Sequence, residues 1–414
     1  MSKRNPLGVL FFTIFLDMLG FGILIPIIPV LFASPASTHY LLPAGTSIQT
    51  GYLLIGFLVA CYAFGQFIAA PIIGQFSDKL GRRKLLIFSV FGTALGHALF
   101  AMGILLRSVP LLFAARLFAG ATGGNIVVAQ AAIADVTTPE NRAKNFGLIG
   151  AAFGLGFIIG PFVGGKLADP HALSWFNATT PFWFAALLSL LNTFLVFYFF
   201  KETNKNSEKR GRIEWGKALK NIAHAFRIPT LRPLFITSFI FQMGFAFYVS
   251  FSAVYLLSHF HFSEGTIGNY FAYVGVWIVF TQGVLMRFAN RLFREQQILN
   301  YSLLTVGLCI VAIVSITHST WLYVVAPFFA MAVGLTQSNM MALVSRSAAQ
   351  EIQGEIMGIS GSLNALAQTV PPLLSGAAAA FFSPAAPLAI AATLIVCSGF
   401  YFITHVHRMR ARAE

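Results

Sequence analysis

The dominant pattern in this chain is a series of long apolar runs separated by short polar segments. A helix needs roughly 20 apolar residues to cross the hydrocarbon core of a bilayer, which is about 30 Å thick. Twelve runs have the required length, and we predict that each is a transmembrane helix. They occupy residues 7–32, 51–76, 85–106, 111–134, 146–166, 181–200, 233–257, 267–286, 297–317, 321–343, 355–382 and 385–406.

One connection between the runs is much longer than the others. Residues 201–232 are polar and basic, and they divide the runs into six before and six after. Many transporters are built from two such repeats, related by a pseudo-two-fold axis. We therefore predict an all-α polytopic fold with a six-helix bundle in residues 1–200, a cytoplasmic linker in 201–232 and a second bundle in 233–414. The loops after the second and eighth runs support a weak repeat, since each begins at a glycine and continues as a basic stretch.

Composition narrows the class of protein further. Hydrophobic residues make up 57% of the chain and charged residues only 10%, with a mean hydropathy of +0.77. Soluble domains carry roughly 25% charged residues, so a soluble fold is excluded, and disorder is excluded because it requires low hydrophobicity. A multi-pass membrane protein remains.

The net charge of +14 is best explained by membrane topology. If the N-terminus is cytoplasmic, 24 of the 27 basic residues fall in cytoplasmic loops and tails and two in external loops. This asymmetry follows the positive-inside rule and predicts that both termini are cytoplasmic. The expected location is a plasma membrane, the inner membrane in a bacterium. No nucleic-acid partner is needed, and we expect the linker to meet anionic membrane lipids.

Several kinds of chemistry have no signature in the sequence. The three cysteines stand alone in separate runs, without the spacing of a disulfide or metal site. No GxxxxGK[ST] phosphate loop is present, and no nucleophile stands beside a base. We expect neither an enzyme nor a bound metal or cofactor.

Three ionisable residues within the runs are candidates for proton coupling: Asp17, His97 and Arg116. A charge near the bilayer centre costs at least about 2.5–3.5 kcal/mol, so such residues usually pair, face a cavity or relay protons. Asp17 can exchange a proton with a water-filled cavity, and Arg116 can stabilise a carboxylate or bind an anion. The alternative is a fixed Asp17–Arg116 ion pair. For His97, the alternative to proton transfer is a neutral ring bonded to a neighbouring helix.

Other polar residues within the runs are candidates for a substrate cavity. On a continuous helix, Gly120, Gly123 and Gln130 fall within about 40° of Arg116 and leave room beside its guanidinium. Asn125 falls on the opposite face, where we expect a bond to another helix. The full set of predicted substrate contacts is Tyr62, Gln66, Gln130, Gln242, Tyr248, Gln337, Asn364 and Gln368. For each of them, simple packing is the alternative.

The fifth run is rich in glycine. Gly160 and Gly164 form a small-xxx-small pair, which permits close backbone contact with another helix, and Gly154 belongs to a similar pair. Pro161 removes a helix hydrogen bond and bends the span. We expect this face to seal the two halves of the protein while allowing one conformation to open.

These motifs together resemble the twelve-helix drug/proton antiporter branch of the major facilitator superfamily. The loop after the second run matches the branch at Gly74, Asp78, Gly81, Arg82 and Arg83. Arg116 with Gly120 matches its fourth-helix motif, and Gly154, Gly160, Pro161 and Gly164 match its fifth-helix motif. The stretches 15–22 and 133–135 are similar to tetracycline exporters specifically. The resemblance implies two bundles that rock about a central cavity, with Asp78 near Arg82 and the eleventh helix latching the inner gate.

The chain departs from tetracycline exporters at the acids of the third and ninth helices. Gly96-His97 stands in the third, and the ninth has no acid. Our hypothesis is a monomeric transporter that exports a small, mostly hydrophobic compound in exchange for protons. One alternative is uptake or facilitated diffusion of a nutrient or organic anion, with Arg116 binding the anion. Another is a membrane receptor or scaffold that transports nothing.

Overall fold

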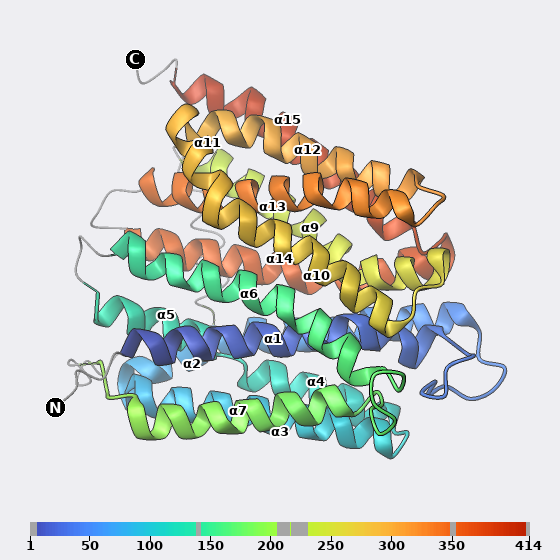
Figure 1. The fold of residues 1–414 in the computed structure, drawn as a ribbon. Helices are drawn as coiled ribbons and strands as arrows, with labels where there is room; N and C mark the ends of the chain where they lie inside the picture. Colours follow the sequence, from blue (N-terminus) through green and yellow to red (C-terminus); the bar gives the residue numbers. More distant parts are fainter. Residues whose placement is uncertain (1–5, 138–141, 205–215, 217–230, 348–352, 411–414) are drawn as a thin grey trace. The chain divides into compact units, whose positions relative to one another are not determined.

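A computed structural model describes residues 6–137, 142–204, 216, 231–347 and 353–410, and these residues form helices joined by loops (Figure 1). The first half contains α1 (Pro6–Ala33), α2 (Ile48–Leu80), α3 (Arg82–Leu105), α4 (Val109–Thr122), α5 (Asn125–Asp135), α6 (Arg142–Ala168) and α7 (Thr180–Phe199). The second half contains α9 (Arg232–Phe260), α10 (Glu264–Phe280), η2 (Thr281–Leu285), α11 (Met286–Leu292), α12 (Glu295–Ser315), α13 (Thr320–Arg346), α14 (Gln353–Phe381) and α15 (Ala386–Arg410). Each predicted run coincides with one helix or with consecutive helices. Among the described residues, ten helical segments are long and apolar enough to cross a membrane.

Two of the predicted runs are interrupted. The fourth was expected to be continuous, and this was wrong: α4 ends at Thr122, and α5 begins at Asn125 after Gly123 and Gly124. Two successive glycines lower helix stability by roughly 1 kcal/mol each relative to alanine, so the break falls where the helix is weakest. The helical projection that placed Gln130 beside Arg116 therefore does not apply. In the eighth run, the π-helical turn η2 separates α10 from α11.

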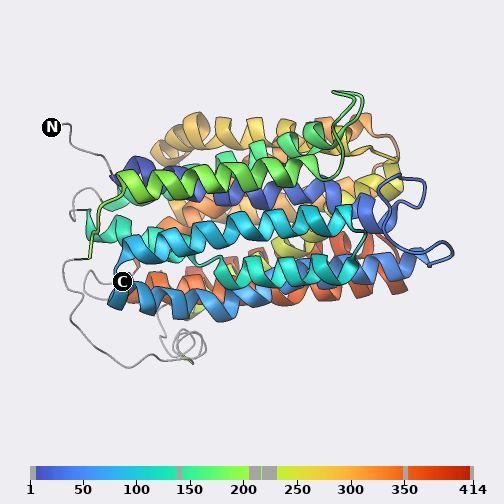
Figure 2. The ribbon, with the colours of Figure 1, turned by 90° about the horizontal axis from the view of Figure 1, so that it is seen from below.

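The chain divides into two compact units, and the same helix pairings occur in each. Unit 1 comprises residues 1–46, 61–215 and 263–272, and unit 2 comprises 47–60, 216–262 and 273–414. In unit 1, α1 packs along α6, and α3 along α4 and α7 (Figure 1, Figure 2). In unit 2, α9 packs along α14, and α12 along α13 and α15. When the spans are counted within each unit, the first packs against the fifth, and the third packs against the fourth and the sixth. This shared pattern supports the predicted repeat.

The predicted domain boundaries at residues 200 and 233 remain a prediction, because most of the linker lies outside the described residues. The units are not simple sequence halves. Residues 47–60, which include the start of α2, group with unit 2, and residues 263–272, which include the start of α10, group with unit 1.

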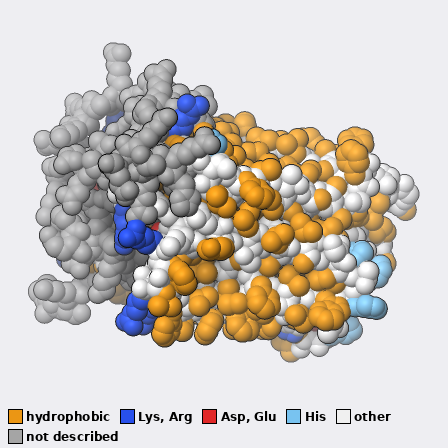
Figure 3. All heavy atoms as spheres, turned by 90° about the horizontal axis from the view of Figure 1, so that it is seen from above, with side chains coloured by type: hydrophobic (Ala, Val, Ile, Leu, Met, Phe, Trp, Pro, Cys, Tyr) orange, Lys and Arg blue, Asp and Glu red, His pale blue; other side chains and the backbone are white. Residues whose placement is uncertain are grey.

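Much of the protein surface is apolar, as expected of a surface that faces lipid. Hydrophobic side chains cover much of the face in Figure 3, whereas the visible Lys and Arg side chains gather toward one end. Phe88 on α3, Phe194 on α7 and Leu308 on α12 are 59%, 52% and 62% exposed. Exposed apolar surface on this scale is unfavourable in water and costs nothing in hydrocarbon. The chain is a multi-pass membrane protein.

Close packing of α1 against α6 positions the first helix, which carries Asp17. A Cβ added to Gly160 would lie 2.7 Å from the Leu19 carbonyl oxygen, and one added to Gly164 would lie 2.5 Å from the Ile23 carbonyl oxygen. Pro161 packs against α1 at Gly22. The predicted glycine face on the fifth span therefore does bring two backbones together. Gly154, on the same helix, is half-buried.

Candidate functional site

Unit 1 contains a pocket between α1, α2, α3 and α4, lined by the polar side chains of Asp17, Tyr62, His97 and Arg116. The room within it for a water-sized molecule is about 20 Å³, so the pocket is narrow in this structure. Apolar side chains complete the lining, among them Phe21, Phe100 and Phe182. The structure thus brings together all three residues predicted to couple protons, and with them one predicted substrate contact, Tyr62.

Asp17 is 7% exposed and hydrogen-bonded on one side only. Its Oδ1 accepts a hydrogen bond from Asn125 Nδ2 at 2.8 Å, while Oδ2 is buried without a hydrogen-bond partner. Asn125 reaches α1 because it is the first residue of α5, directly after the glycine break. The predicted bond from Asn125 to a neighbouring helix is confirmed. A buried carboxylate with one free oxygen can accept a proton without losing the bond that orients it.

Arg116 is 5% exposed and lies against an aromatic ring. Its Cζ is 4.4 Å from the centroid of the Tyr62 ring, and its Nε has no hydrogen-bond partner. A desolvated cation–π contact of this kind contributes about 2 kcal/mol. The described residues form three ion pairs, Arg82–Asp78, Arg82–Asp135 and Arg346–Glu295, and Asp17–Arg116 is not among them. The fixed Asp17–Arg116 ion pair is therefore not the arrangement in this structure.

His97 packs against the helix that carries Asp17. The ring is 8% exposed, and its Nε2 would lie 2.7 Å from a Cβ built on Gly20, three residues after Asp17. Because any larger residue at position 20 would collide with the imidazole, the glycine is what admits His97 to the pocket. A predicted alternative, a bond from His97 to a neighbouring helix, has no support among the hydrogen bonds of the described residues.

The other predicted substrate contacts are distributed over both units. In unit 1, Gln66 Nε2 donates to the Gly123 carbonyl at 3.0 Å and so satisfies the backbone at the helix break. Neither Gln66 nor Gln130 lines the pocket. In unit 2, Tyr248 is buried with its ring 4.7 Å from that of Phe329. Also in unit 2, Gln242, Gln337 and Asn364 are half-buried and Gln368 is exposed. Substrate contact by these residues stays a prediction.

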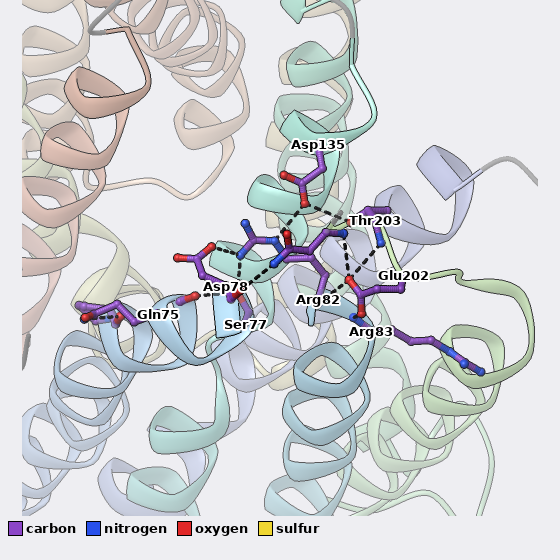
Figure 4. Close-up of polar contacts among 11 residues, drawn as sticks. Gln75, Ser77, Asp78, Arg82, Arg83, Asp135, Glu202 and Thr203 are labelled. Carbon is purple, nitrogen blue, oxygen red and sulfur yellow. Dashed lines mark hydrogen bonds and ion pairs between the residues drawn. The ribbon is translucent and has the colours of Figure 1, made fainter. Parts of the chain in front are cut away.

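A second polar group, which we name the Arg82 cluster, joins the end of α2 and the start of α3 to the end of α5 and the segment after α7 (Figure 4). It comprises Ser77, Asp78, Arg82, Asp135, Glu202, Thr203 and Asn204. The guanidinium of Arg82 is its centre: Nη1 contacts Asp78 Oδ1 at 2.6 Å and donates to Ser77 Oγ at 2.6 Å, and Nε donates to Asp135 Oδ2 at 3.1 Å. The predicted proximity of Asp78 to Arg82 is confirmed, with Asp78 near the end of α2 and Arg82 at the start of α3.

The remaining residues of the predicted gating motif surround the cluster. Gly81 has φ +96°, a conformation that favours glycine, and it is the N-cap of α3. The guanidinium of Arg83 lies 5.4 Å from the centroid of the Phe197 ring and donates to the Phe197 carbonyl. Gly74 lies within α2, where an added Cβ would contact Val127 at 3.1 Å.

Sequence reasoning missed Glu202. Its carboxylate accepts backbone hydrogen bonds from Arg82 and Arg83 at the start of α3, at 2.9 and 3.1 Å. The two segments are 120 residues apart, and nothing in the local sequence around Glu202 indicates the contact. Asp135 was noted only as part of a family-like stretch, and its bond to Arg82 was likewise not predicted.

Outside the spans, His39 in the loop between α1 and α2 has a perturbed environment. Partial burial lowers its pKa below the usual 6.5. The carboxylate of Glu264 opposes this shift and the guanidinium of Arg107 adds to it. Arg107 is held in this loop region by a hydrogen bond from its Nη2 to the Thr38 carbonyl at 3.3 Å.

Comparison with known proteins agrees with this architecture. Residues 10–372 match the Major Facilitator Superfamily. The chain is 30% identical to a class H tetracycline resistance protein of Pasteurella multocida, over 90% of this chain and 88% of the relative. It is 28% identical to Multidrug resistance protein 1 of Bacillus subtilis, over 88% of this chain and 87% of the relative.

Solved structures share the fold at lower sequence identity. The human organic anion transporter MFSD10 superposes with a TM-score of 0.73 at 23% identity, covering 97% of this chain and all of the other. A D-xylose–proton symporter superposes with a TM-score of 0.74 at 18% identity, covering 96% and 97%. With a family match over most of its length, ten helical segments among the described residues that are long and apolar enough to cross a membrane, and two units with the same helix pairings, the chain belongs to the Major Facilitator Superfamily of membrane transporters.

Proposed function

We propose that the chain exports a small, mostly hydrophobic compound in exchange for protons, by alternating access. The observation that carries the proposal is Asp17: it is the acid that lies in the middle of a described span, and it faces a pocket with one carboxylate oxygen unpaired. A membrane charge that is costly to bury and open to a pocket is by default a functional group. Asp17 is the proposed proton acceptor.

Arg116 and His97 complete the proposed coupling site. Arg116 stays charged and lines the same pocket as Asp17, and it is the proposed second charge of the coupling site. His97, against Gly20, is positioned to take part in proton exchange with the same pocket. The membrane potential supplies about 2.3 kcal/mol per charge at 100 mV, enough for roughly a fifty-fold gradient of exported compound.

The Arg82 cluster is the proposed inner gate, and the glycine face of α6, which packs against α1 within unit 1, is the proposed rigid support of the coupling helix. In the cluster, the guanidinium at the start of α3 links the ends of α2 and α5, so that a movement of any of these helices breaks a charged hydrogen bond. Gly160, Pro161 and Gly164 hold α1 in place while the bundles move. We further propose that both termini are cytoplasmic, that the membrane is a bacterial inner membrane, and that the monomer is the working unit.

The relatives favour a drug-like substrate. The similar proteins are named for resistance to tetracycline and to multiple drugs. Aromatic side chains around the coupling pocket and the Tyr248–Phe329 pair in unit 2 suit hydrophobic, aromatic compounds.

One observation favours a second candidate function, the transport of an organic anion. Arg116 is buried without a carboxylate within ion-pair distance among the described residues, so an anionic substrate is a suitable partner for it. A protonated Asp17 would strengthen that attraction. This candidate therefore predicts that proton and anion move together rather than in exchange.

Proteoliposomes with a pH-sensitive dye inside test both candidates. Purified protein is first screened by thermal shift against tetracycline, ethidium and the carboxylated aromatic p-aminohippurate. We expect transport of a compound that stabilises the protein to be accompanied by proton movement in the opposite direction. Asp17→Asn should abolish this exchange. Asp169→Asn, an acid in the loop after α6, is the matched control and should transport normally. Proton movement in the same direction as p-aminohippurate would establish the second candidate, and undiminished exchange by Asp17→Asn would refute the proton role.

A further inference from the structure

The first turn of α3 has an unfavourable distribution of charge. The helix begins with Arg82, Arg83 and Lys84, and no acid lies in its first turn. The N-terminus of a helix carries the equivalent of about +0.5 charge, so cations there are destabilising. The unsatisfied amides of this turn need acceptors, and Gly81 at the N-cap has no side chain to supply one.

Glu202, just beyond α7, supplies both the missing acceptor and the missing negative charge. Its Oε2 accepts from the Arg83 amide, and its Oε1 accepts from the amides of Arg82, Thr203 and Asn204 at 2.9–3.0 Å. Four backbone donors thus converge on one carboxylate. A charged acceptor at a helix N-terminus is the strongest available cap for such a turn.

The Glu202 carboxylate fits beside position 81 because glycine has no Cβ. A Cβ at position 81 would collide with Glu202 Oε2, and the backbone there has φ +96°. The two residues after Glu202 fasten the same segment to the cluster. Thr203 Oγ1 donates to Asp135 Oδ2 at 3.2 Å, and Asn204 Nδ2 donates to the Asp78 carbonyl at 2.7 Å.

The equivalent helix in unit 2, α12, is capped by residues of its own first turn. The helix α12 begins with Glu295, an acid placed where the helix dipole favours it. The Arg294 amide donates to the side-chain oxygen of Gln297 at 3.0 Å, within the same turn. The caps of α12 are local, whereas α3 depends on a residue 120 positions away.

We propose that Glu202 is a positioning residue for Arg82: its carboxylate fixes the first turn of α3 so that one guanidinium reaches Ser77, Asp78 and Asp135 together. The beginning of the segment after α7 is thereby part of the inner gate. The inference rests on the proposed function only in treating the Arg82 cluster as that gate.

The test measures how well Arg82 covers Ser77, which is fully buried with its Oγ against the guanidinium. Ser77→Cys is introduced into a full-length chain whose native cysteines, Cys61, Cys309 and Cys397, are replaced. Its labelling rate with a water-soluble maleimide is followed in nanodiscs, where both faces are accessible. We expect Glu202→Ala to accelerate labelling at least tenfold. Glu202→Gln, which keeps one acceptor but loses the charge, should have an intermediate effect.

Glycine variants separate the carboxylate contact from backbone strain. Gly81→Ala displaces the carboxylate and should accelerate labelling as Glu202→Ala does, and the double variant should be no faster than Gly81→Ala alone. Gly45→Ala is the matched control, since Gly45 also has positive φ, +85°, but no atom within 4 Å of an added Cβ. It should leave the labelling rate unchanged.

A reporter on the same helix distinguishes positioning from loss of structure. Ser89 lies on α3 and is fully buried. A Ser89→Cys reporter should label slowly in every variant if Glu202 acts only on the first turn. Unchanged labelling of Ser77→Cys in Glu202→Ala, or equal acceleration at Ser89→Cys, would overturn the proposal. Labelling needs neither substrate nor proton gradient, so the result is independent of whether proton exchange is observed.

Discussion

The contact between α1 and α6 permits a quantitative prediction, because it is made by backbone atoms that cannot rotate away. In Gly160→Ala, the new Cβ would lie 2.7 Å from the Leu19 carbonyl oxygen and 2.8 Å from the Gly22 Cα. An ordinary van der Waals contact begins at 3.4 Å. The two helices must therefore separate by about 0.7 Å or distort locally.

The expected cost follows from two opposing effects. Overpacking of this kind costs about 1–3 kcal/mol, while the higher helix propensity of alanine over glycine returns up to about 1 kcal/mol. We predict a net destabilisation of about 1–2 kcal/mol. Because α1 carries Asp17, its displacement also disturbs the 2.8 Å hydrogen bond from Asn125 and should slow proton-coupled transport.

Unfolding of the purified protein in nanodiscs measures the first effect, with Gly361→Ala as the matched control. Gly361 also lies inside a helix, α14, but an added Cβ meets no atom within 4 Å. The control should gain up to about 1 kcal/mol from helix propensity alone. We therefore expect the free energy of unfolding to fall in Gly160→Ala and to rise in Gly361→Ala. If Gly160→Ala is as stable as Gly361→Ala, the backbone contact does not limit how close α1 and α6 approach.

Three further predictions concern charged groups. Asp78→Asn removes one partner of Arg82 and should lower the maximal transport rate with the protein still inserted; an unchanged rate would exclude a gating role for the pair. Arg346→Gln should cost less than about 1 kcal/mol, because the Arg346 side chain is 73% exposed and its ion pair with Glu295 is screened by solvent; a larger loss in unfolding experiments would contradict this interpretation of the pair. His39 has a lowered pKa in the folded state, so the unfolded chain binds the proton more tightly and stability should fall as pH drops below about 6.5. His39→Gln should flatten that pH dependence of the melting temperature, and an unaltered slope would assign it to other groups.

Much of the architecture was predictable because it depends on local properties of the chain. Length and hydrophobicity of a segment decide whether it can cross a bilayer, and all twelve runs are helical in the structure. The break after Thr122 was not predicted, although Gly123-Gly124 was visible, because paired glycines in membrane helices are equally compatible with close packing.

The candidate site was predictable only in part. A charged residue in an apolar run stands out in any sequence, so Asp17 and Arg116 were identified, and the structure places both at one pocket. The residues that contact Asp17 and Arg116 were not predicted. The alternative of a mutual ion pair is not found among the described residues, where Asp17 contacts Asn125 and Arg116 contacts Tyr62.

The sequence by itself therefore determined which segments enter the membrane, which charges are out of place there, and which family the chain resembles. The first two follow from free energies of transfer, which each residue carries wherever it lies, and the resemblance follows from short motifs with fixed spacing. Only the tertiary structure decided that Asn125 bonds Asp17 from 108 positions away, and that Glu202 caps α3 from 120 positions away. Such contacts depend on which helices meet and at what height, and packing of whole helices, not any local pattern, sets that geometry.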